Sequence, residues 1–293
     1  MIDFASNTRK LKTLLGKAIT QQLDSVERSG LLFSGGLDSS ILLALLSTLN
    51  TTPIPLLVAG ITSSKDIKAA TSAAAALGLQ IEVQHFTLDD VERALPTIIT
   101  ASESTDVLQV SLAIPLHFSA IHARKLGVTT LVSGQGADEL FGGYARYERL
   151  ILKEERQSVL AEMIEDLKTL MQVTLPCQKS LVQYHGIQLV TPFLSPGIVA
   201  FSKSLPLHHK IITTDSRVVR KRILRKLAKD LRLPGFIVNA PKRALQYGSG
   251  SSRILARLST RFWQQREPTI PRREARSHAN IHRFLCLVKE GLG

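Results

Sequence analysis

The chain of 293 residues is 44% hydrophobic and 21% charged, a composition that excludes a disordered protein and predicts one large domain or two small ones. Apolar runs such as residues 41–46 fall far short of the roughly 20 residues that span a bilayer, and the first ten residues lack an apolar signal core. We therefore expect a cytoplasmic protein without a membrane partner. The net charge of +13 is concentrated in residues 201–293, which hold 21 Lys and Arg against 5 Asp and Glu.

Short apolar strands alternate with helices in the first half of the chain. A helical spacing of apolar residues covers residues 6–28, 38–49, 65–77, 88–101 and 111–125. Buried strands are expected at residues 30–33, 56–61, 80–86 and 128–132. This alternation predicts an α/β fold with a parallel sheet and helices on both faces, in which ligands bind at the carboxyl ends of the strands.

The second half of the chain has a different pattern. From about residue 145 onward we expect no strand, and residues 151–171 and 216–231 have a helical spacing. Residues 264–280 are polar, charged and interrupted by proline, which is typical of a loop. We therefore predict an α/β core over residues 1–150 and a mainly helical, basic part over residues 151–293, packed on the core within one continuous domain.

A glycine turn follows the first strand. The string from Leu32 to Ser40 joins a strand end, the turn Ser34-Gly35-Gly36 and a helix N-terminus, an arrangement whose backbone N–H groups suit a phosphate. Hydroxyl donors are added by Ser34, Ser39 and Ser40. Asp38 would repel a phosphate unless a cation bridged them, which predicts Mg²⁺. No lysine follows Gly36, so the loop is not a Walker motif. It resembles the PP-loop of N-type ATP pyrophosphatases, which cleave ATP to AMP and pyrophosphate.

A second glycine turn follows the fourth strand. It has the sequence Ser133-Gly134-Gln135-Gly136-Ala137-Asp138. An ordinary turn before a helix is one interpretation, because Asp138 and Glu139 suit the helix dipole. Two glycine turns at equivalent strand ends, each followed by an acid, can also face one nucleotide. On that interpretation Asp38 and Asp138 hold Mg²⁺ on the pyrophosphate.

Together the two loops indicate a family. SGGLDSS at residues 34–40, followed by SGQGADELFGGY at 133–144, resembles the synthetase domain of asparagine synthetases and, beyond them, β-lactam synthetase, over roughly residues 5–250. The resemblance implies an adenine nucleotide alpha hydrolase-like fold and a reaction that depends on ATP and Mg²⁺. In that reaction a carboxylate, aspartate or a related acid, becomes an acyl-adenylate with release of pyrophosphate. An amine then attacks the activated carbonyl and AMP leaves.

The resemblance also assigns residues. It implies nucleotide contacts at Phe33 and Ala59 and, within the second loop, at Ser133 and Gly134. It further implies that Glu103 takes a proton from the incoming nitrogen and that Lys242 offsets charge on the α-phosphate and the tetrahedral adduct. Without the two loops, Glu103 would be interpreted as a solvated helix end and Lys242 as one more charge of a basic tail.

The chain departs from the family in two respects. It reaches the first loop within 34 residues, without the N-terminal glutaminase domain of the glutamine-dependent enzymes. We therefore expect ammonia, another amine or a separate glutaminase subunit to supply the nitrogen. The chain keeps Pro-Phe-Leu at 192–194 but has Gln188, Val190 and Ser195 where the family usually has an acid, an arginine and an aspartate. The upstream family residues are likewise replaced, at Lys179, Ser180, Val182 and Gln183. The identity of the carboxylate is therefore left open.

Two other functions compete with the ligase. The basic C-terminal part favours a tRNA-modifying N-type ATP pyrophosphatase, so nucleic acid is a second candidate partner. The absence of any CxxC pair argues against the thiolating kind of such an enzyme. The altered region around residues 188–195 favours a non-catalytic nucleotide-binding subunit of a larger complex.

Overall fold

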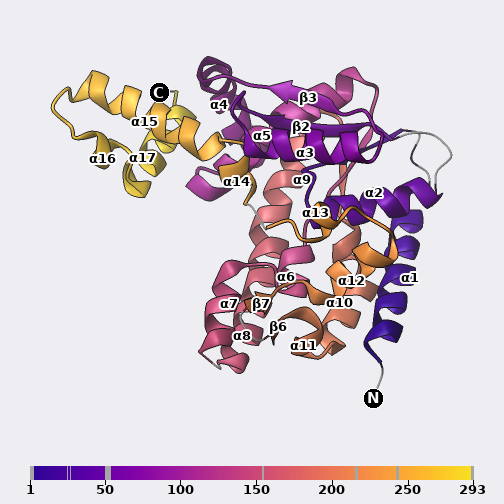
Figure 1. Ribbon diagram of the computed structural model, residues 1–293. Coiled ribbons are helices and arrows are strands. Elements are labelled where there is room, and N and C mark those ends of the chain that lie inside the picture. The colour runs from indigo at the N-terminus through magenta and orange to yellow at the C-terminus, as the bar shows by residue number, and fades with distance from the viewer. Residues whose placement is uncertain are drawn as a thin grey trace.

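A parallel sheet forms the centre of the molecule (Figure 1). The computed structural model describes residues 3–24, 26, 28–49, 54–153, 155–214, 217–241 and 244–291. Within them the sheet has five strands in the order β3-β2-β1-β4-β5, and all four pairings are parallel. Its strands are β1 (Ser29–Leu32), β2 (Leu56–Gly60), β3 (Glu82–His85), β4 (Thr130–Val132) and β5 (Gln188–Val190).

Helices cover both faces of this sheet, which confirms the predicted fold class. The helices before β4 are α1 (Phe4–Leu23), α2 (Leu37–Leu49), α3 (Lys65–Ala76), α4 (Leu88–Ser102) and α5 (Val107–Lys125). One group is α4, α5 and the later α9 (Leu175–Tyr184), which contact one another and strands β2, β3 and β5. The other group contains α1, α2 and α12 (Arg222–Asp230). Right-handed crossovers between parallel strands account for this division.

The strand order reverses between β1 and β4. From β1 the chain moves outward to β2 and β3, and then returns to place β4 on the opposite side of β1. Leu31 lies opposite Val132 in the register of these two strands, so β1 and β4 end close to each other. A crevice forms at such a reversal because the connections leave toward opposite faces of the sheet. Both predicted glycine turns begin at this point.

The prediction of no strand after residue 145 was wrong. The fifth strand of the sheet, β5, comes from this region, and β6 (Ile212–Thr214) and β7 (Arg217–Val219) form a separate antiparallel ribbon. Each of these strands has three residues, too few to establish a period of two. Consequently α12 begins at Arg222 rather than at residue 216.

A long helical stretch faces the strand ends. After α6 (Ala137–Phe141) and α7 (Ala145–Leu152), helix α8 (Arg156–Thr169) continues through the π-helical segment η1 (Leu170–Thr174) into α9. The segment ends two residues before Pro176, which has no N–H and whose ring would crowd the carbonyl four residues earlier in a regular α-helix. The remaining elements before the C-terminal helices are η2 (Pro192–Leu194), α10 (Pro196–Ser204), α11 (Leu207–Lys210), α13 (Gly235–Val238) and α14 (Leu245–Gly248).

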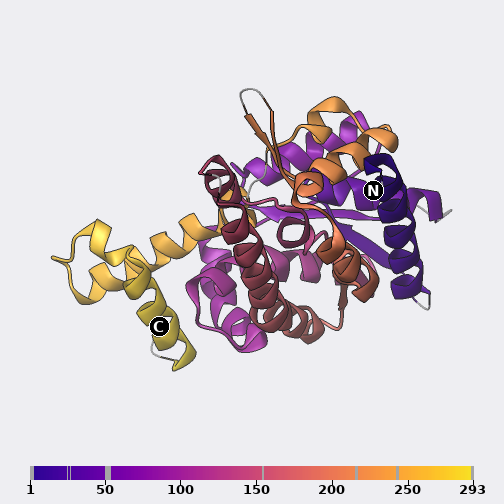
Figure 2. The ribbon, with the colours of Figure 1, turned by 90° about the horizontal axis from the view of Figure 1, so that it is seen from below.

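Three helices form a C-terminal lobe that projects from the body (Figures 1 and 2). They are α15 (Ser251–Arg266), α16 (Arg272–Ala275) and α17 (His278–Lys289). The loop predicted for residues 264–280 is therefore confined to the short connections around α16. Buried Trp263 donates its indole N–H to the carbonyl of Asn280 at 3.0 Å, and this contact holds α17 against α15. Within residues 264–280, Ile270 and Ala275 are buried, and the polar sequence concealed them because they are widely spaced.

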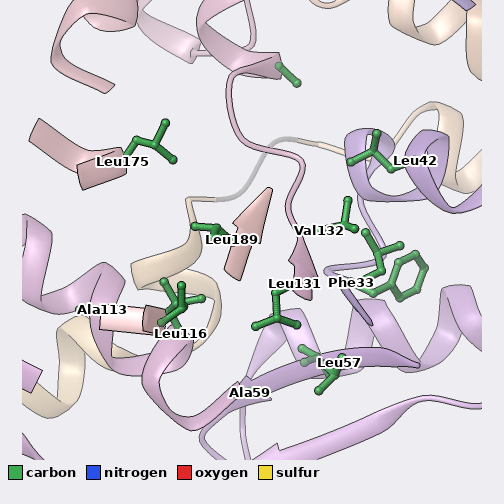
Figure 3. Packing of buried hydrophobic residues seen from close by; sticks show 14 of the residues in the cluster. Phe33, Leu42, Leu57, Ala59, Ala113, Leu116, Leu131, Val132, Leu175 and Leu189 are labelled. Carbon is green, nitrogen blue, oxygen red and sulfur yellow. The ribbon is translucent and has the colours of Figure 1, made fainter. Parts of the chain in front are cut away.

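The main hydrophobic core runs from the sheet into the flanking helices and the lobe. Figure 3 shows part of it, where Leu131 of β4 lies between Leu57 of β2 and Leu189 of β5, and Val132 lies near Phe33. Burial on both faces explains why the strands read as short apolar runs rather than as alternating patterns. Among the described residues, no helix combines the length and hydropathy needed to cross a bilayer.

Candidate active site

The loop after β1 is built around a glycine that no other residue can replace without strain. Gly35 has φ of +67°, and a Cβ on it would lie 2.4 Å from the carbonyl oxygen of Ala69. The Gly36 N–H donates to Ser34 Oγ at 3.3 Å, and Ser39 Oγ lies 3.3 Å from the same atom. The loop leads directly into the N-terminus of α2, whose positive partial charge favours an anion.

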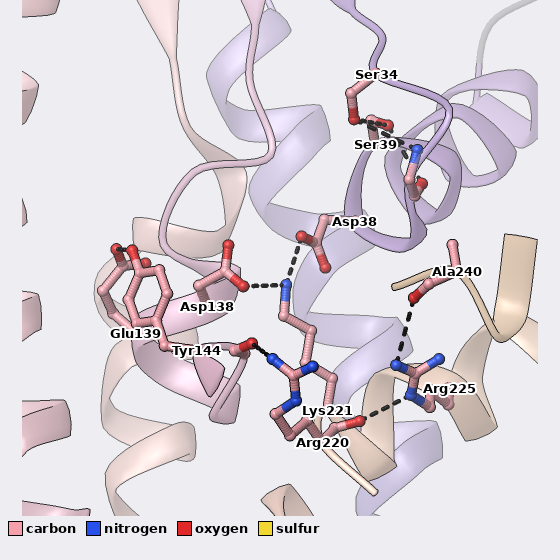
Figure 4. A network of polar contacts seen from close by, with 12 residues as sticks. Ser34, Asp38, Ser39, Asp138, Glu139, Tyr144, Arg220, Lys221, Arg225 and Ala240 are labelled. Carbon is pink, nitrogen blue, oxygen red and sulfur yellow. Dashed lines mark hydrogen bonds and ion pairs between the residues drawn. The ribbon is translucent and has the colours of Figure 1, made fainter. Parts of the chain in front are cut away.

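Lys221 lies between the two predicted magnesium ligands (Figure 4). Its Nζ is 2.6 Å from Asp38 Oδ2 and 2.7 Å from Asp138 Oδ1. Only 5% of the lysine side chain is exposed, so the two carboxylates balance a buried ammonium. Lys221 also has φ of +53°, a left-handed conformation that costs energy outside glycine. The surrounding contacts hold the residue in this conformation at the N-terminus of α12.

Gly143 makes room for this arrangement. A Cβ at that position would lie 1.8 Å from Asp138 Oδ1 and 2.4 Å from Lys221 Cε. The Gly143 carbonyl accepts a hydrogen bond of 2.6 Å from Arg220 Nη1, and Arg220 Nε lies 3.3 Å from Glu148 Oε2. The glycine therefore packs directly against the carboxylates and is also joined to the segment that carries Lys221.

Arg225 connects this segment to the chain before Lys242. Its guanidinium donates to the carbonyls of Arg220, Val238 and Ala240. Burial lowers the pKa of Arg225, with a further contribution from the charge of Arg220. One buried guanidinium thus satisfies three backbone carbonyls and fixes two loops relative to each other.

The two glycine loops border a cavity of about 620 Å³, a size typical of small-molecule sites. Phe33 and Ala59 line it at the strand ends, and Leu108 and Leu112 line it from α5. Further lining residues come from the segment between α6 and η1, from α12 and its start, and from residues 240–241 and 244–247. They include Glu139, Tyr144, Asp166, Thr174, Lys221 and Gln246. The cavity therefore combines apolar surface with charged side chains, among them Asp38 and Asp138.

A tyrosine orients the carboxylate of Glu139 at this cavity. Tyr144 Oη donates to Glu139 Oε1, and both side chains line the cavity (Figure 4). Burial and the neighbouring acids raise the pKa of Tyr144 above its ordinary value, so the phenol keeps its proton and remains a donor. The guanidinium carbon of Arg146 lies 4.4 Å from the Tyr144 ring centroid, and Arg146 is paired with Asp166 and Glu162.

Most of the predicted nucleotide-binding residues meet at the cavity. Its lining includes Phe33, Ser34, Gly35, Gly36, Asp38, Ser39, Ala59, Ser133, Gly134 and Asp138. Ser40 is the exception in the loops, because it is fully buried behind the first turn and does not line the cavity. The helical spacing explains this, since consecutive residues of α2 point in different directions.

The two residues predicted to be catalytic are placed differently. Lys242 lies outside the described residues, although Pro241 and Ala244 on either side of it line the cavity. Glu103 does not line the cavity. Exposed Glu103 ends α4 in a left-handed conformation and accepts a hydrogen bond of 3.3 Å from Oγ of half-buried Ser180. The helix α5 begins to face the cavity only at Leu108, after the turn that contains Glu103.

Asp38 and Asp138 fit a magnesium ion by their chemistry. Carboxylate oxygens are the protein ligands that Mg²⁺ prefers, and both groups already share one cation, the ammonium of Lys221. Asp38 Oδ1 is buried and makes no hydrogen bond within the described part of the chain. Because Asp38 lines the cavity, this oxygen can coordinate a cation that binds there.

The positions at which the chain departs from the family pattern lie away from the cavity. None of Gln188, Val190, Ser195, Lys179, Ser180, Val182 and Gln183 belongs to its lining. Val182 and Val190 are buried in the core, whereas Lys179, Gln183 and Gln188 are exposed. These replacements therefore alter packing and surface rather than the groups that face the cavity.

Lys221, Arg220 and Arg225 were missed from the sequence. They belong to the run RKRILR at residues 220–225, which resembles a solvated helix because only Ile223 and Leu224 in it are apolar. A lysine with two distant carboxylate partners leaves no local pattern. The only available signal was the excess of cations over acids in this half of the chain.

Comparison with known proteins gives one family. The family model described as asparagine synthase matches residues 10–161 and 151–285. A candidate glutamine-hydrolyzing asparagine synthetase 1 of Methanocaldococcus jannaschii is 28% identical over 280 residues, which cover 86% of this chain and 51% of that protein. The root glutamine-hydrolyzing asparagine synthetase of Pisum sativum is 30% identical over 258 residues, which cover 83% of this chain and 43% of that protein. The chain thus spans about half the length of these relatives. The NMN synthetase of Francisella tularensis aligns over 99% of this chain and 94% of its own, with a TM-score of 0.43 and 11% identity.

Proposed function

The chain belongs to the asparagine synthase family, and we propose that it is an ATP-dependent ligase that joins a carboxylic acid to ammonia or another amine. The observation that carries this proposal is the contact of Lys221 with Asp38 and Asp138, from the two glycine loops, in the lining of one cavity. The loops provide backbone N–H groups and a helix N-terminus for phosphates, and the acids provide a site for the accompanying cation.

The proposed position of ATP follows from the chemistry of the lining. The phosphates lie on the turn 34–36 and against the second turn at Ser133 and Gly134. The adenine lies beside Phe33 and Ala59, where the lining is apolar and backbone groups of the strand ends are near. Mg²⁺, when held by Asp38 and Asp138, would neutralise charge on the departing pyrophosphate.

In the first proposed step a carboxylate oxygen of the substrate attacks the α-phosphorus of ATP. The bond from that phosphorus to the bridging oxygen breaks, pyrophosphate leaves, and an acyl-adenylate forms. Negative charge grows on the phosphate oxygens during this step, and the ammonium of Lys221 is the buried cation placed to offset it. Lys242 is proposed to act on the same charge from the segment between Pro241 and Ala244.

In the second proposed step the amine nitrogen attacks the acyl carbonyl and must lose a proton before AMP leaves. The resemblance to the family assigned this proton to Glu103. Glu139 is better placed because its carboxylate lines the cavity and Tyr144 fixes its orientation. We therefore propose Glu139 as the proton acceptor in this chain, with Glu103 as the alternative.

For the nitrogen donor and the carboxylic acid we propose classes of compound rather than single compounds. The relatives named above are glutamine-hydrolyzing enzymes of about twice the length covered by this chain. Ammonia, another amine, or ammonia released by a separate glutaminase subunit would each serve the second step. Aspartate or a related acid is the proposed carboxylate, since the family replacements lie outside the cavity lining.

The test is product analysis with the purified chain, Mg-ATP, ammonium and a panel of carboxylic acids led by aspartate. We expect an amide of one acid, identified by mass spectrometry, together with one pyrophosphate for each amide formed. Asparagine from aspartate would fix the substrate, and an amide of another acid would assign that acid instead. Absence of any amide, in a protein shown to bind ATP, would contradict the proposed ligase.

A further inference from the structure

The C-terminal lobe carries a basic charge for which the proposed ligase has no use. Residues 251–291 hold eight Arg and one Lys against three Glu. All nine basic side chains belong to exposed residues, namely Arg253, Arg257, Arg261, Arg266, Arg272, Arg273, Arg276, Arg283 and Lys289. The lobe projects from the body in both views, which leaves much of its surface open to a large partner (Figures 1 and 2).

Part of this charge forms one continuous face. Arg253, Arg257 and Arg261 follow one another at intervals of four residues on α15, so they lie along one side of the helix. The buried residues Leu255, Leu258 and Phe262 occupy the other side. Arg276 Nε donates to Thr260 Oγ1 at 3.2 Å, which places a fourth guanidinium beside this row. We call Arg253, Arg257, Arg261 and Arg276 the arginine face.

Little of this charge is neutralised inside the molecule. Arg261 Nη1 pairs with Glu92 at 2.7 Å and with Asp89 at 3.6 Å on α4. Arg276 contacts a neutral hydroxyl. Among the described residues, Arg253 and Arg257 form no ion pair. The arginine face therefore presents positive charge that a polyanion can neutralise with release of its counterions.

The surface around the arginine face distinguishes between kinds of polyanion. The large apolar residues exposed elsewhere, such as Ile164 and Phe236, have no counterpart within the lobe, because none of its described large apolar residues is exposed. Protein interfaces and membrane-inserted surfaces both use exposed aromatic or aliphatic anchors. A nucleic-acid backbone needs only cations, and the guanidinium fork matches a phosphate in a bidentate manner.

We propose that the arginine face is a binding site for the phosphate backbone of a nucleic acid. The contacts are electrostatic and independent of base sequence, so affinity falls steeply as salt rises. The site is separate from the cavity proposed to bind ATP, because none of the four arginines lines that cavity. A binding assay for the arginine face therefore tests this proposal independently of the proposed ligase reaction.

The test is fluorescence anisotropy of a short, end-labelled single-stranded RNA titrated with the full chain, between about 50 and 200 mM salt. Four phosphate contacts predict that the logarithm of the association constant falls with that of the salt concentration with a slope of about −3. The double variant Arg253→Glu/Arg257→Glu should bind about tenfold or more weakly at the lower salt. Lys12→Glu/Lys17→Glu changes the same charge on exposed positions of α1 and should bind almost as wild type.

Three results would overturn the proposal. One is no anisotropy change at low salt, and another is an equal loss of affinity in both double variants, which would indicate an effect of net charge alone. The third is displacement of the RNA by polyglutamate as effectively as by unlabelled RNA, which would point to an acidic protein. Thermal unfolding of both variants, measured beforehand, ensures that only folded proteins are compared.

Discussion

The Nζ atom of Lys221 lies 2.6 Å from Oδ2 of Asp38, although 183 positions separate the two residues in the chain. The contact joins the first turn of α2 to the start of α12, and Asp138 completes it from the second glycine loop. A buried ammonium with two carboxylates is stable only while all three charges remain. The proposed pyrophosphate site is thus also a structural element of the fold.

Removal of the central charge should therefore destabilise the protein. Lys221→Gln leaves buried Asp138 and half-buried Asp38 without their ammonium, and we expect the free energy of unfolding to fall by about 3–5 kcal/mol in magnesium-free buffer. Millimolar Mg²⁺ should restore much of the loss, because it would replace the missing cation. Urea unfolding with and without Mg²⁺ measures both effects. Lys12→Gln, an exposed change on α1, is the control, and equal stability of the two variants would contradict this account.

Gly143 offers a test of geometry without a change of charge. In Gly143→Ala the new Cβ would lie 1.8 Å from Asp138 Oδ1, so the carboxylate must move. A displacement of about 1 Å in a group of the active site is expected to lower turnover by about 100-fold. Gly16→Ala, whose Cβ would have no neighbour within 4 Å, should keep full activity and stabilise α1 by about 1 kcal/mol. Normal turnover in Gly143→Ala would refute the assigned position of Asp138.

The two candidate proton acceptors predict opposite results. Glu139→Gln removes a base that faces the cavity, and we expect a loss in kcat of about 100-fold or more. Glu103→Gln changes an exposed side chain outside the cavity and should leave kcat near that of wild type. Steady-state amide formation by the two variants decides the matter. The reverse outcome would return the role to Glu103, as the family resemblance implies.

A buried histidine pair predicts loss of stability in acid. His185 Nε2 lies 3.0 Å from His117 Nδ1, and burial, with a smaller contribution from His185, lowers the pKa of His117 to about 4. The unfolded chain binds this proton near pH 6.5, so stability falls as the pH drops below that value and the loss is complete near pH 4. The shift corresponds to about 3 kcal/mol. His117→Gln should flatten this part of the pH profile of urea unfolding, whereas exposed His278→Gln should not.

The first half of the fold was predictable because each element there has its own local signal. The strands β1, β2 and β4 are apolar runs that end at glycine or polar turns, and the helices between them keep a regular apolar spacing. Strand β5 has no such signal, since Gln188–Val190 becomes a strand only by pairing with β4. The buried residues Ile270 and Ala275 of the lobe were likewise concealed by polar neighbours.

The residues of the candidate site likewise divide into those that a local sequence pattern indicates and those that only the folded chain brings together. Asp38 and Asp138 were predicted as ligands because each follows a glycine turn at a strand end, a pattern that the chain order alone displays, and the structure brings them together at Lys221. Lys221 was missed because its role depends on two partners that only the folded chain brings to it. Glu103 was selected by a short motif, and the position of the turn before α5 separates it from the cavity. Local patterns identify loops, whereas distant ion pairs require the structure.

We propose above that ATP bound in the cavity is cleaved between its α- and β-phosphates, beside the carboxylates of Asp38 and Asp138. The most direct measurement follows ATP labelled at the α-phosphate in the presence of Mg²⁺, ammonium and the panel of acids. We predict labelled AMP, formed only with an acceptable acid and lost in Asp38→Asn and in Asp138→Asn. Labelled ADP in place of AMP, or undiminished AMP in both variants, would contradict the account.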